Sequence, residues 1–265
     1  MGQAKGGSRF TIHTKTAGFE DGCLTRERVY KAMQESLEQL QVTNVETYFL
    51  HSPDPTTPIE ETLSAIQELY LAGKFKRFGL SNFNAEELVD VYDLCRERGY
   101  VLPTVFQGNY NPVARHAERD LFPLLRKLSI AFHAYSPLAG GFLAKSPEQF
   151  EAPIEGRWDP GSEVGRLYNR LYNKPHLIAA LMQWGEAADK ARCTRAALAY
   201  RWVRYHSSIR VESGDAILIG ASSKEQLLQT LACLKDGPLP QAVLPIIEAV
   251  WQQVKDEAPH GNFHG

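Results

Sequence analysis

His51 is the first residue in the chain whose type and position suggest chemistry. It directly follows Val45–Leu50, a short aromatic-rich segment that is typical of a buried strand. An imidazole at the carboxyl end of such a strand can exchange a proton near neutral pH or polarise a bound group. Taken alone, His51 would be better explained as a strand-end histidine whose ring nitrogens bond to neighbouring residues.

Other strand-like segments also end on reactive or polar side chains. The strands predicted at 9–15, 75–80, 104–107 and 131–135 lead to Lys15, to Ser81 and Asn82, to Gln107 and to Tyr135. In folds with parallel strands the carboxyl ends gather at one face, where ligands bind. The repetition favours a functional interpretation of Lys15 and His51 over a structural one.

A turn of small residues follows the last predicted strand, 216–219. It places Ser222, Ser223 and Lys224 at the start of a helix that includes Gln226. Backbone amides and the helix dipole at such a turn, together with hydroxyls and a cation, suit the binding of a phosphate. The simpler alternative is that Ser223 only caps the helix.

The segment 139–174 is punctuated by glycine and proline and shows no regular pattern. A connection of this length in a compact domain is commonly either functional or mobile. Its arginines and aromatic side chains suit an anionic or aromatic ligand, so we interpret it as a lid rather than as a flexible insertion. The candidate substrate-binding residues of this lid are Arg157, Trp158, Arg166, Tyr168 and Arg170.

Helices are predicted between the strands. Amphipathic patterns and capping residues indicate them after Thr25, from a capping box at Thr57–Glu60 to Gly73, from Asn84 to Gly99, and at 118–128, 177–191, 195–205 and 241–255. Alternating strands and helices imply parallel pairs joined by right-handed crossovers. Because six strands are recognisable, the fold class expected is α/β, a TIM-type (β/α)8 barrel that lacks its first two strands and has a long loop before the last strand.

Size and composition favour a single domain, residues 1–265. The chain has 265 residues, of which 43% are hydrophobic, and this is enough for one large core. A net charge of −2 provides no basic field for nucleic acid or an anionic membrane, and no apolar run is long enough to span a bilayer. The four cysteines are far apart, as expected of reduced thiols in the cytoplasm, and no metal site is predicted.

Six short motifs of the chain occur in the order typical of one enzyme family. They are Ile12–Lys15, Phe49–Asp54, Gly79–Phe83, Phe106–Asn111, Tyr135–Gly141 and Ile219–Leu227. In these motifs the chain resembles the aldo-keto reductases, most closely the aflatoxin aldehyde reductase branch and its fungal relatives. The resemblance covers nearly the whole chain. It implies a TIM barrel that binds NADPH and reduces aldehyde or ketone groups of small molecules, with fungal secondary metabolism as the expected setting.

The resemblance also implies roles for individual residues. Lys15 resembles the family's catalytic lysine, and His51 the histidine that orients and polarises the carbonyl. Tyr135 resembles the ring that stacks on the nicotinamide. The other positions that resemble cofactor-binding residues are Ser81, Asn82, Gln107, Ser136, Leu138, Gly140, Ser222, Ser223, Lys224 and Gln226.

The family's catalytic tyrosine and its aspartate partner lie on the second barrel strand and the loop after it, and this chain starts after both. We therefore expect an N-terminally shortened chain with weak or absent aldehyde reduction. Two alternatives stay open: a repurposed enzyme that uses Lys15 and His51 for isomerisation, dehydration or cyclisation, and a non-catalytic nucleotide-binding subunit. The strands containing Ile12 and Leu218 would be unpaired edges, so we expect a homo-oligomer that covers them.

Overall fold

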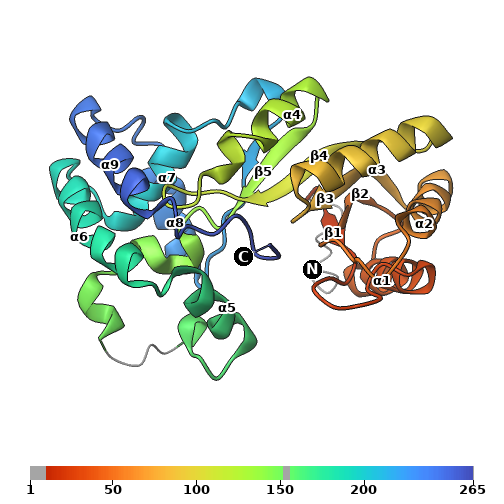
Figure 1. Ribbon diagram of the computed structural model, residues 1–265, viewed down its shortest axis with the longest axis horizontal. Coiled ribbons are helices and arrows are strands. Elements are labelled where there is room, and N and C mark those ends of the chain that lie inside the picture. Colours follow the sequence, from red (N-terminus) through yellow and green to blue (C-terminus); the bar gives the residue numbers. More distant parts are fainter. Residues whose placement is uncertain (1–9, 152–155, 265) are drawn as a thin grey trace. The chain divides into compact units, whose positions relative to one another are not determined.

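The computed structural model describes residues 10–151 and 156–264 (Figure 1). Its Cα atoms group into two compact units. The first unit runs to Gln107 and includes Leu124–Ala131, and the second comprises Gly108–Pro123 and the residues from Phe132 onward. The first residue of the strand predicted at 9–15 lies outside the described residues. We describe each unit by itself.

The first unit contains parallel strands joined by helices, as the alternating pattern of the sequence predicts. Each strand is followed by a helix that returns the chain to the start of the next parallel strand. The elements in chain order are β1 (His13–Lys15), α1 (Arg26–Leu40), β2 (Val45–Leu50), α2 (Ile59–Leu71), β3 (Phe75–Ser81), α3 (Ala85–Arg98) and β4 (Pro103–Asn109).

Strand register aligns the carboxyl ends in this unit. Lys15 is the partner of Phe49 in the β1–β2 pair, and Ser81 is the partner of Gln107 in the β3–β4 pair. Phe49 is also the partner of Gly79, where an added Cβ atom would lie 2.4 Å from the Phe49 ring. Residue 79 must therefore be glycine for the buried phenyl ring to pack in this register.

Helix starts were predicted at Thr57, as a capping box, and at Asn84, and the second of them is confirmed. The Asn84 side chain accepts from the Glu87 amide at 2.9 Å, and the Glu87 carboxylate accepts from the Asn84 amide at 2.7 Å. The capping box at Thr57 is wrong, because α2 begins at Ile59 with Pro58 as its N-cap. The Thr57 hydroxyl instead donates to the Asp54 carboxylate at 2.7 Å, which removes it from the helix end.

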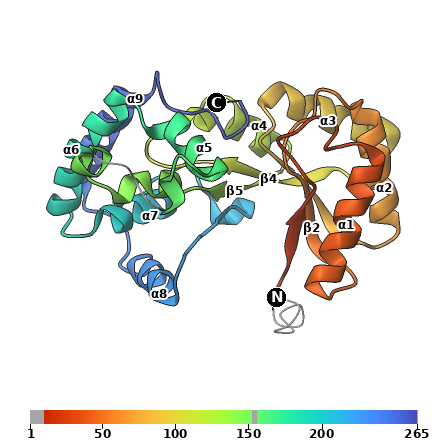
Figure 2. The same ribbon diagram turned by 90° about the horizontal axis from the view of Figure 1, so that it is seen from below.

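The second unit is mainly helical around one short strand pair. Strand β6 (Ala216–Ile217) runs parallel to β5 (Ala131–Tyr135). Helix α6 lies beside α9 (Figure 1), whereas α8 stands apart from both (Figure 2). The helices are α4 (Leu121–Lys127), which crosses the boundary between the units, α5 (Glu163–Tyr172), α6 (Pro175–Lys190), α7 (Arg195–Tyr205), α8 (Lys224–Cys233) and α9 (Leu244–Val254).

Two expectations for this part of the chain need correction. The helix predicted at 118–128 begins only at Leu121, after a 3-10 turn at His116–Glu118. Pro123 explains the later start, since proline is tolerated in the first turn of a helix and not in its interior. The connection 139–174 is long, as predicted, but it is partly regular: α5 starts with the Ser162 hydroxyl accepting from the Gly165 amide at 3.0 Å.

The structure confirms the predicted fold class. Six parallel strands alternate with helices, which corresponds to a (β/α)8 barrel without its first two strands. The strands follow one another in chain order, and those predicted at 45–50 and 131–135 match the observed bounds. Within the residues that the structure describes, no helix is long and apolar enough to cross a membrane.

Candidate active site

Lys15 and His51 lie next to each other at the carboxyl ends of β1 and β2. Lys15 is the last residue of β1, and His51 follows the last residue of β2. The pairing continues past the strands, because the Thr16 amide donates to the Phe49 carbonyl at 2.9 Å and the His51 amide donates to the Thr16 hydroxyl at 3.1 Å. Backbone contacts therefore hold the two residues in adjacent positions.

The surroundings of both side chains favour their neutral forms. Burial lowers the pKa of the Lys15 ammonium below its ordinary value, and the Lys15 Nζ atom lies 5.6 Å from the centre of the Phe49 ring. Burial, and then the positive charge of Lys15, lowers the pKa of His51 to about 4. His51 is consequently a neutral imidazole at physiological pH, and it can donate one hydrogen bond without carrying a charge.

Three more predicted residues belong to this group. The Asn82 amide nitrogen donates to the His51 carbonyl at 2.8 Å and to the Ser81 hydroxyl at 3.2 Å. Asn82 adopts φ 63°, a left-handed conformation that asparagine tolerates better than most residues. Ser81, Asn82 and Gln107 are all buried, and Gln107 pairs with Ser81 across β3 and β4. The first unit thus brings together Lys15, His51, Ser81, Asn82 and Gln107, as predicted.

Asp54 is a structural residue that the sequence analysis missed. Its carboxylate accepts hydrogen bonds from the amides of Gly22, Leu24 and Thr56 and from the hydroxyls of Thr56 and Thr57. Burial raises the pKa of Asp54, but the hydrogen bonds from Thr56, Leu24 and Thr57 outweigh it and lower the pKa to about 2. Asp54 therefore ties the loop after Lys15 to the loop after His51.

A cavity of about 940 Å³ lies within the second unit. It is large enough for a sizeable organic ligand. Its lining contains five residues that were predicted to bind a cofactor and two that were predicted to bind substrate, namely Ser136, Leu138, Gly140, Ser222 and Gln226, and Arg157 and Tyr168. Residues that are far apart in the sequence are thus brought together around one cavity.

One wall of the cavity depends on Gly140. Its φ is +66°, and an added Cβ atom would lie 2.1 Å from the Tyr168 ring, so no other residue fits there. The indole nitrogen of the buried Trp158 donates to the Gly140 carbonyl at 2.9 Å. The Arg157 guanidinium stacks on the Tyr168 ring at 5.2 Å and donates to its hydroxyl at 3.2 Å. Trp158 supports this wall from behind, while Arg157 and Tyr168 face the cavity.

The turn before α8 has the capping arrangement expected from the simpler alternative. The Ser223 hydroxyl accepts from the Gln226 amide at 3.2 Å, and Ser222 donates to the Gln226 side chain through both its amide and its hydroxyl. Lys224 is exposed and, like Ser223, is not part of the cavity lining. The hydrogen bonds of Ser222 and Gln226 fix the helix start at the edge of the cavity.

Tyr135 ends β5, and its hydroxyl accepts from the Asn262 amide at 3.4 Å. Burial raises its pKa well above the ordinary tyrosine value. Tyr172 is a buried tyrosine for which the sequence predicted no role: its hydroxyl accepts from Asn109 at 3.0 Å and from Asn111 at 3.3 Å. The asparagines after Gln107 were a signal for this contact, since buried amides require partners.

Three predicted lid residues do not line the cavity. Trp158 lies behind its wall, Arg166 donates to the Gly161 carbonyl at 3.1 Å, and Arg170 is exposed. In the described part of the chain, no group of three or more histidine, cysteine, aspartate or glutamate side chains is arranged to hold a metal ion.

Comparison with known proteins places this chain among enzymes. It is 43% identical over 259 residues to a Leptosphaeria maculans protein named oxidoreductase sirO, covering 98% of this chain and 78% of that protein. It is 37% identical over 268 residues to human aflatoxin B1 aldehyde reductase member 2, covering 98% of this chain and 74% of the human protein. It is 38% identical over 252 residues to an aldo-keto reductase of Pseudocercospora fijiensis, covering 94% and 85% of the two chains.

The match to a whole family agrees with these pairwise similarities. The model of the aldo/keto reductase family matches residues 3–252, which include both the Lys15–His51 group and the cavity of the second unit. Oxidoreductases and aldehyde reductases are among the similar proteins. The chain belongs to the aldo/keto reductase family.

Proposed function

We propose that this chain is an NADPH-dependent reductase of aldehyde or ketone groups in small molecules and that it acts in fungal secondary metabolism. The observation that carries the proposal is the pair formed by Lys15 and His51. Both side chains lie at the carboxyl ends of adjacent parallel strands, and burial lowers the pKa of each. Such shifts at a site where ligands usually bind are typical of functional residues.

His51 and Lys15 have complementary roles in this proposal. The neutral His51 ring donates a hydrogen bond to the carbonyl oxygen of the substrate and so orients it. The Lys15 ammonium, in its poorly solvated position, stabilises the negative charge that develops on the same oxygen and gives it the proton that completes the alcohol. Asn82 fixes the backbone at His51 through the 2.8 Å hydrogen bond to its carbonyl.

The residues of the second unit are suited to a dinucleotide. Its cavity has glycine at the wall where a backbone must approach closely, an arginine beside it and a helix start at its edge, all of which suit phosphates. We propose that Ser136, Leu138 and Gly140 bind the pyrophosphate and that Ser222, Ser223, Lys224 and Gln226 bind the 2′-phosphate and adenosine. In the first unit, Ser81, Asn82 and Gln107 would bind the carboxamide of the cofactor. Tyr135 would stack on its nicotinamide ring, which supplies the hydride when NADPH is bound.

Turnover with a panel of aldehydes and ketones tests the proposal. NADPH consumption should be accompanied by stoichiometric alcohol, measured by mass spectrometry. Conversion of a candidate substrate without NADPH consumption would favour an isomerase, dehydratase or cyclase that uses Lys15 and His51. NADPH binding without conversion of any candidate substrate would favour a non-catalytic nucleotide-binding subunit.

We expect the chain to bind NADPH more tightly than NADH. Lys224 is the exposed cation at the start of α8 and would pair with the 2′-phosphate that only NADPH carries. Replacing Lys224 with glutamate should lower NADPH affinity by about 10- to 100-fold, the range expected for a lost charged hydrogen bond, and leave NADH affinity unchanged. Calorimetric titration of both nucleotides measures this, with Lys235→Glu, an exposed lysine two residues after the end of α8, as the matched control. Equal affinity of the wild-type chain for the two nucleotides would contradict the prediction.

We further propose that the chain self-associates. Among the described residues β1 pairs only with β2 and β6 only with β5, so each has one unpaired side. Helix α8 has no buried residue and exposes Leu227, Leu228 and Leu231. We expect a dimer or larger species by light scattering and a shift toward monomer in Leu228→Glu. Leu71→Glu, at an exposed leucine of α2, should have no effect. A monomer at every concentration would contradict this proposal.

We also propose that residues 1–265 form one barrel domain and that the chain works in the cytoplasm. All four cysteines are free thiols, two buried and two partly buried. Free thiols are usual for proteins of reducing compartments.

A further inference from the structure

The last part of the chain, Ala258–His264, packs against other residues of the second unit, and we call it the tail segment. The His260 ring is stacked on the His116 ring with 3.9 Å between centroids and 8° between planes. Two residues further on, the Asn262 amide donates to the Tyr135 hydroxyl at 3.4 Å. The stacked histidines thus lie close in the chain to the tail's contact with Tyr135.

His116 is in an environment that disfavours its charged form. The edge of the Trp251 ring approaches it with 5.2 Å between centroids, and its Nε2 atom is buried with no hydrogen-bond partner in the described part of the chain. Burial, followed by the effect of His260, lowers the pKa of His116, although the carbonyls of Ala258 and Lys255 partly oppose this. A proton on Nε2 would therefore be added to a site with no acceptor.

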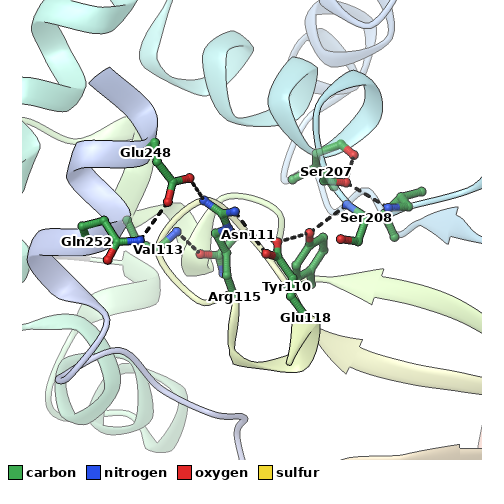
Figure 3. A network of polar contacts seen from close by, with 11 residues as sticks. Tyr110, Asn111, Val113, Arg115, Glu118, Ser207, Ser208, Glu248 and Gln252 are labelled. Carbon is green, nitrogen blue, oxygen red and sulfur yellow. Dashed lines mark hydrogen bonds and ion pairs between the residues drawn. The ribbon is translucent and has the colours of Figure 1, made fainter. Parts of the chain in front are cut away.

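The residue beside His116 is firmly anchored. Arg115 donates to Glu118 at 3.0 Å and to Glu248 of α9 at 2.7 Å (Figure 3). Its guanidinium also stacks on Trp202 and Trp251. This network fixes the 3-10 turn that carries His116 to α9. Of the two stacked rings, His260 is the exposed one, so we expect it to be the ring that moves away.

We propose that the stacked pair His116–His260 is a pH-sensitive latch, which docks the tail segment at neutral pH and releases it under mildly acidic conditions. Two neutral imidazoles can stack in contact, whereas two imidazolium ions at this distance repel each other. Release would remove the Asn262 amide from Tyr135. Tyr135 is the residue proposed to bind the nicotinamide ring, so an effect of release on cofactor binding rests on the proposed function. The latch itself does not.

The direction in which docking depends on pH follows from the lowered pKa of His116. The stacked His260 is one of the causes that lower the pKa of His116, so the docked state binds fewer protons than a state in which the two rings have separated. Docking is therefore strongest above pH 6.5 and weakens as the pH falls, by up to about tenfold for each pH unit until the docked pKa is reached.

The other charged groups nearby do not reverse this sign. Arg119 disfavours a charge on His116, and Asp120, which would favour a charge on His260, is already paired with Arg119. From α9 and the residues after it, His116 faces the ring of Trp251 and the carbonyls of Lys255 and Ala258. Just before the tail segment, Glu257 pairs with His176, and its carbonyl accepts from Lys174 at 2.7 Å. These contacts hold residue 257 in place, so we expect release to begin after it.

Carboxypeptidase digestion of the full chain tests the latch. The rate of tail removal is measured at about pH 7.5 and about pH 5.5 and divided by the rate for a free peptide of residues 256–265. We expect this ratio to rise by up to about tenfold on acidification in the wild-type chain. In His260→Gln the ratio should change little with pH. In His264→Gln, a matched histidine of the same tail segment, it should rise as in the wild type.

A second measurement applies even where a variant folds poorly. Carbon-detected NMR of the histidine rings follows the protonation of His116 and His260 in the wild-type chain at equilibrium. Stacked rings are expected to show two linked titration steps, in which His116 is protonated at a pH below its ordinary pKa. An unchanged digestion ratio in the wild type, an equal pH response in His260→Gln, or independent titration of the two rings would each overturn the proposal.

Discussion

Replacing Lys15 with methionine is expected to lower kcat for carbonyl reduction by about 100- to 1000-fold, the usual loss when one group that stabilises an oxyanion is removed. Methionine keeps the length of the side chain and its contact with Phe49 but removes the charge. The substrate itself is uncharged at this oxygen, so KM should change far less than kcat. Steady-state kinetics with the best aldehyde of the panel, together with the circular dichroism spectrum, measures both effects. His51→Ala should show a comparable loss.

The control and the pH profile separate catalysis from folding. Lys31→Met, at an exposed position of α1, should keep wild-type kcat. Because burial lowers the pKa of Lys15, the wild-type rate should fall on the alkaline side as the ammonium loses its proton. His51, with a pKa of about 4, stays neutral through this range and contributes no step there. Normal turnover in both Lys15→Met and His51→Ala would show that the two residues are only structural.

Replacing Asp54 with alanine is expected to reduce the free energy of unfolding by about 3 kcal/mol, since hydrogen bonds to a charged, buried group are lost together. Five donors from two loops would lose their acceptor. Urea denaturation measures the loss. Asp54→Asn keeps the shape of the side chain and one acceptor oxygen, so its free energy of unfolding should fall less. Asp21→Ala, at an exposed residue of the loop that contains Gly22 and Leu24, should have almost no effect on the free energy of unfolding.

Acid should lower the free energy of unfolding by protonating Asp54, as the Asp54→Ala substitution lowers it by removing the carboxylate. Its pKa is lowered in the folded chain, so its contribution to stability is complete above the ordinary aspartate pKa of 3.8 and is lost as the pH falls to about 2. The difference in stability between wild type and Asp54→Ala should therefore shrink across this interval. A difference that stays constant down to pH 2 would contradict the assignment of the charge.

The parts of the fold and site that were predictable depend on local patterns. Strand β2 was recognisable because it ends on the apolar run Tyr48–Leu50, and His51 and Asn82 were recognisable because each directly follows a predicted strand or its last residue. Parallel strands then align their ends without further information, which brings Lys15 beside His51. The capping box at Asn84 was equally local, since its two partners are three residues apart.

The parts that were missed depend on contacts between distant residues. Thr57 matched the capping pattern, but the Asp54 carboxylate binds its hydroxyl and its role in the helix is lost. The donors that Asp54 binds in the other loop are 30 and 32 residues away, and no local pattern marks them. The stacking of His116 on His260 likewise depends on the path of the chain end.

Phe49 connects the candidate lysine to a residue that the lysine does not touch. The phenyl ring under Lys15 fits only because the neighbouring strand has a hydrogen atom in place of a side chain at Gly79. A single methyl group at that position would displace the ring and admit water to the amine. The proton affinity of this amine can therefore be tuned from the next strand but one, by volume alone, without altering any charged group.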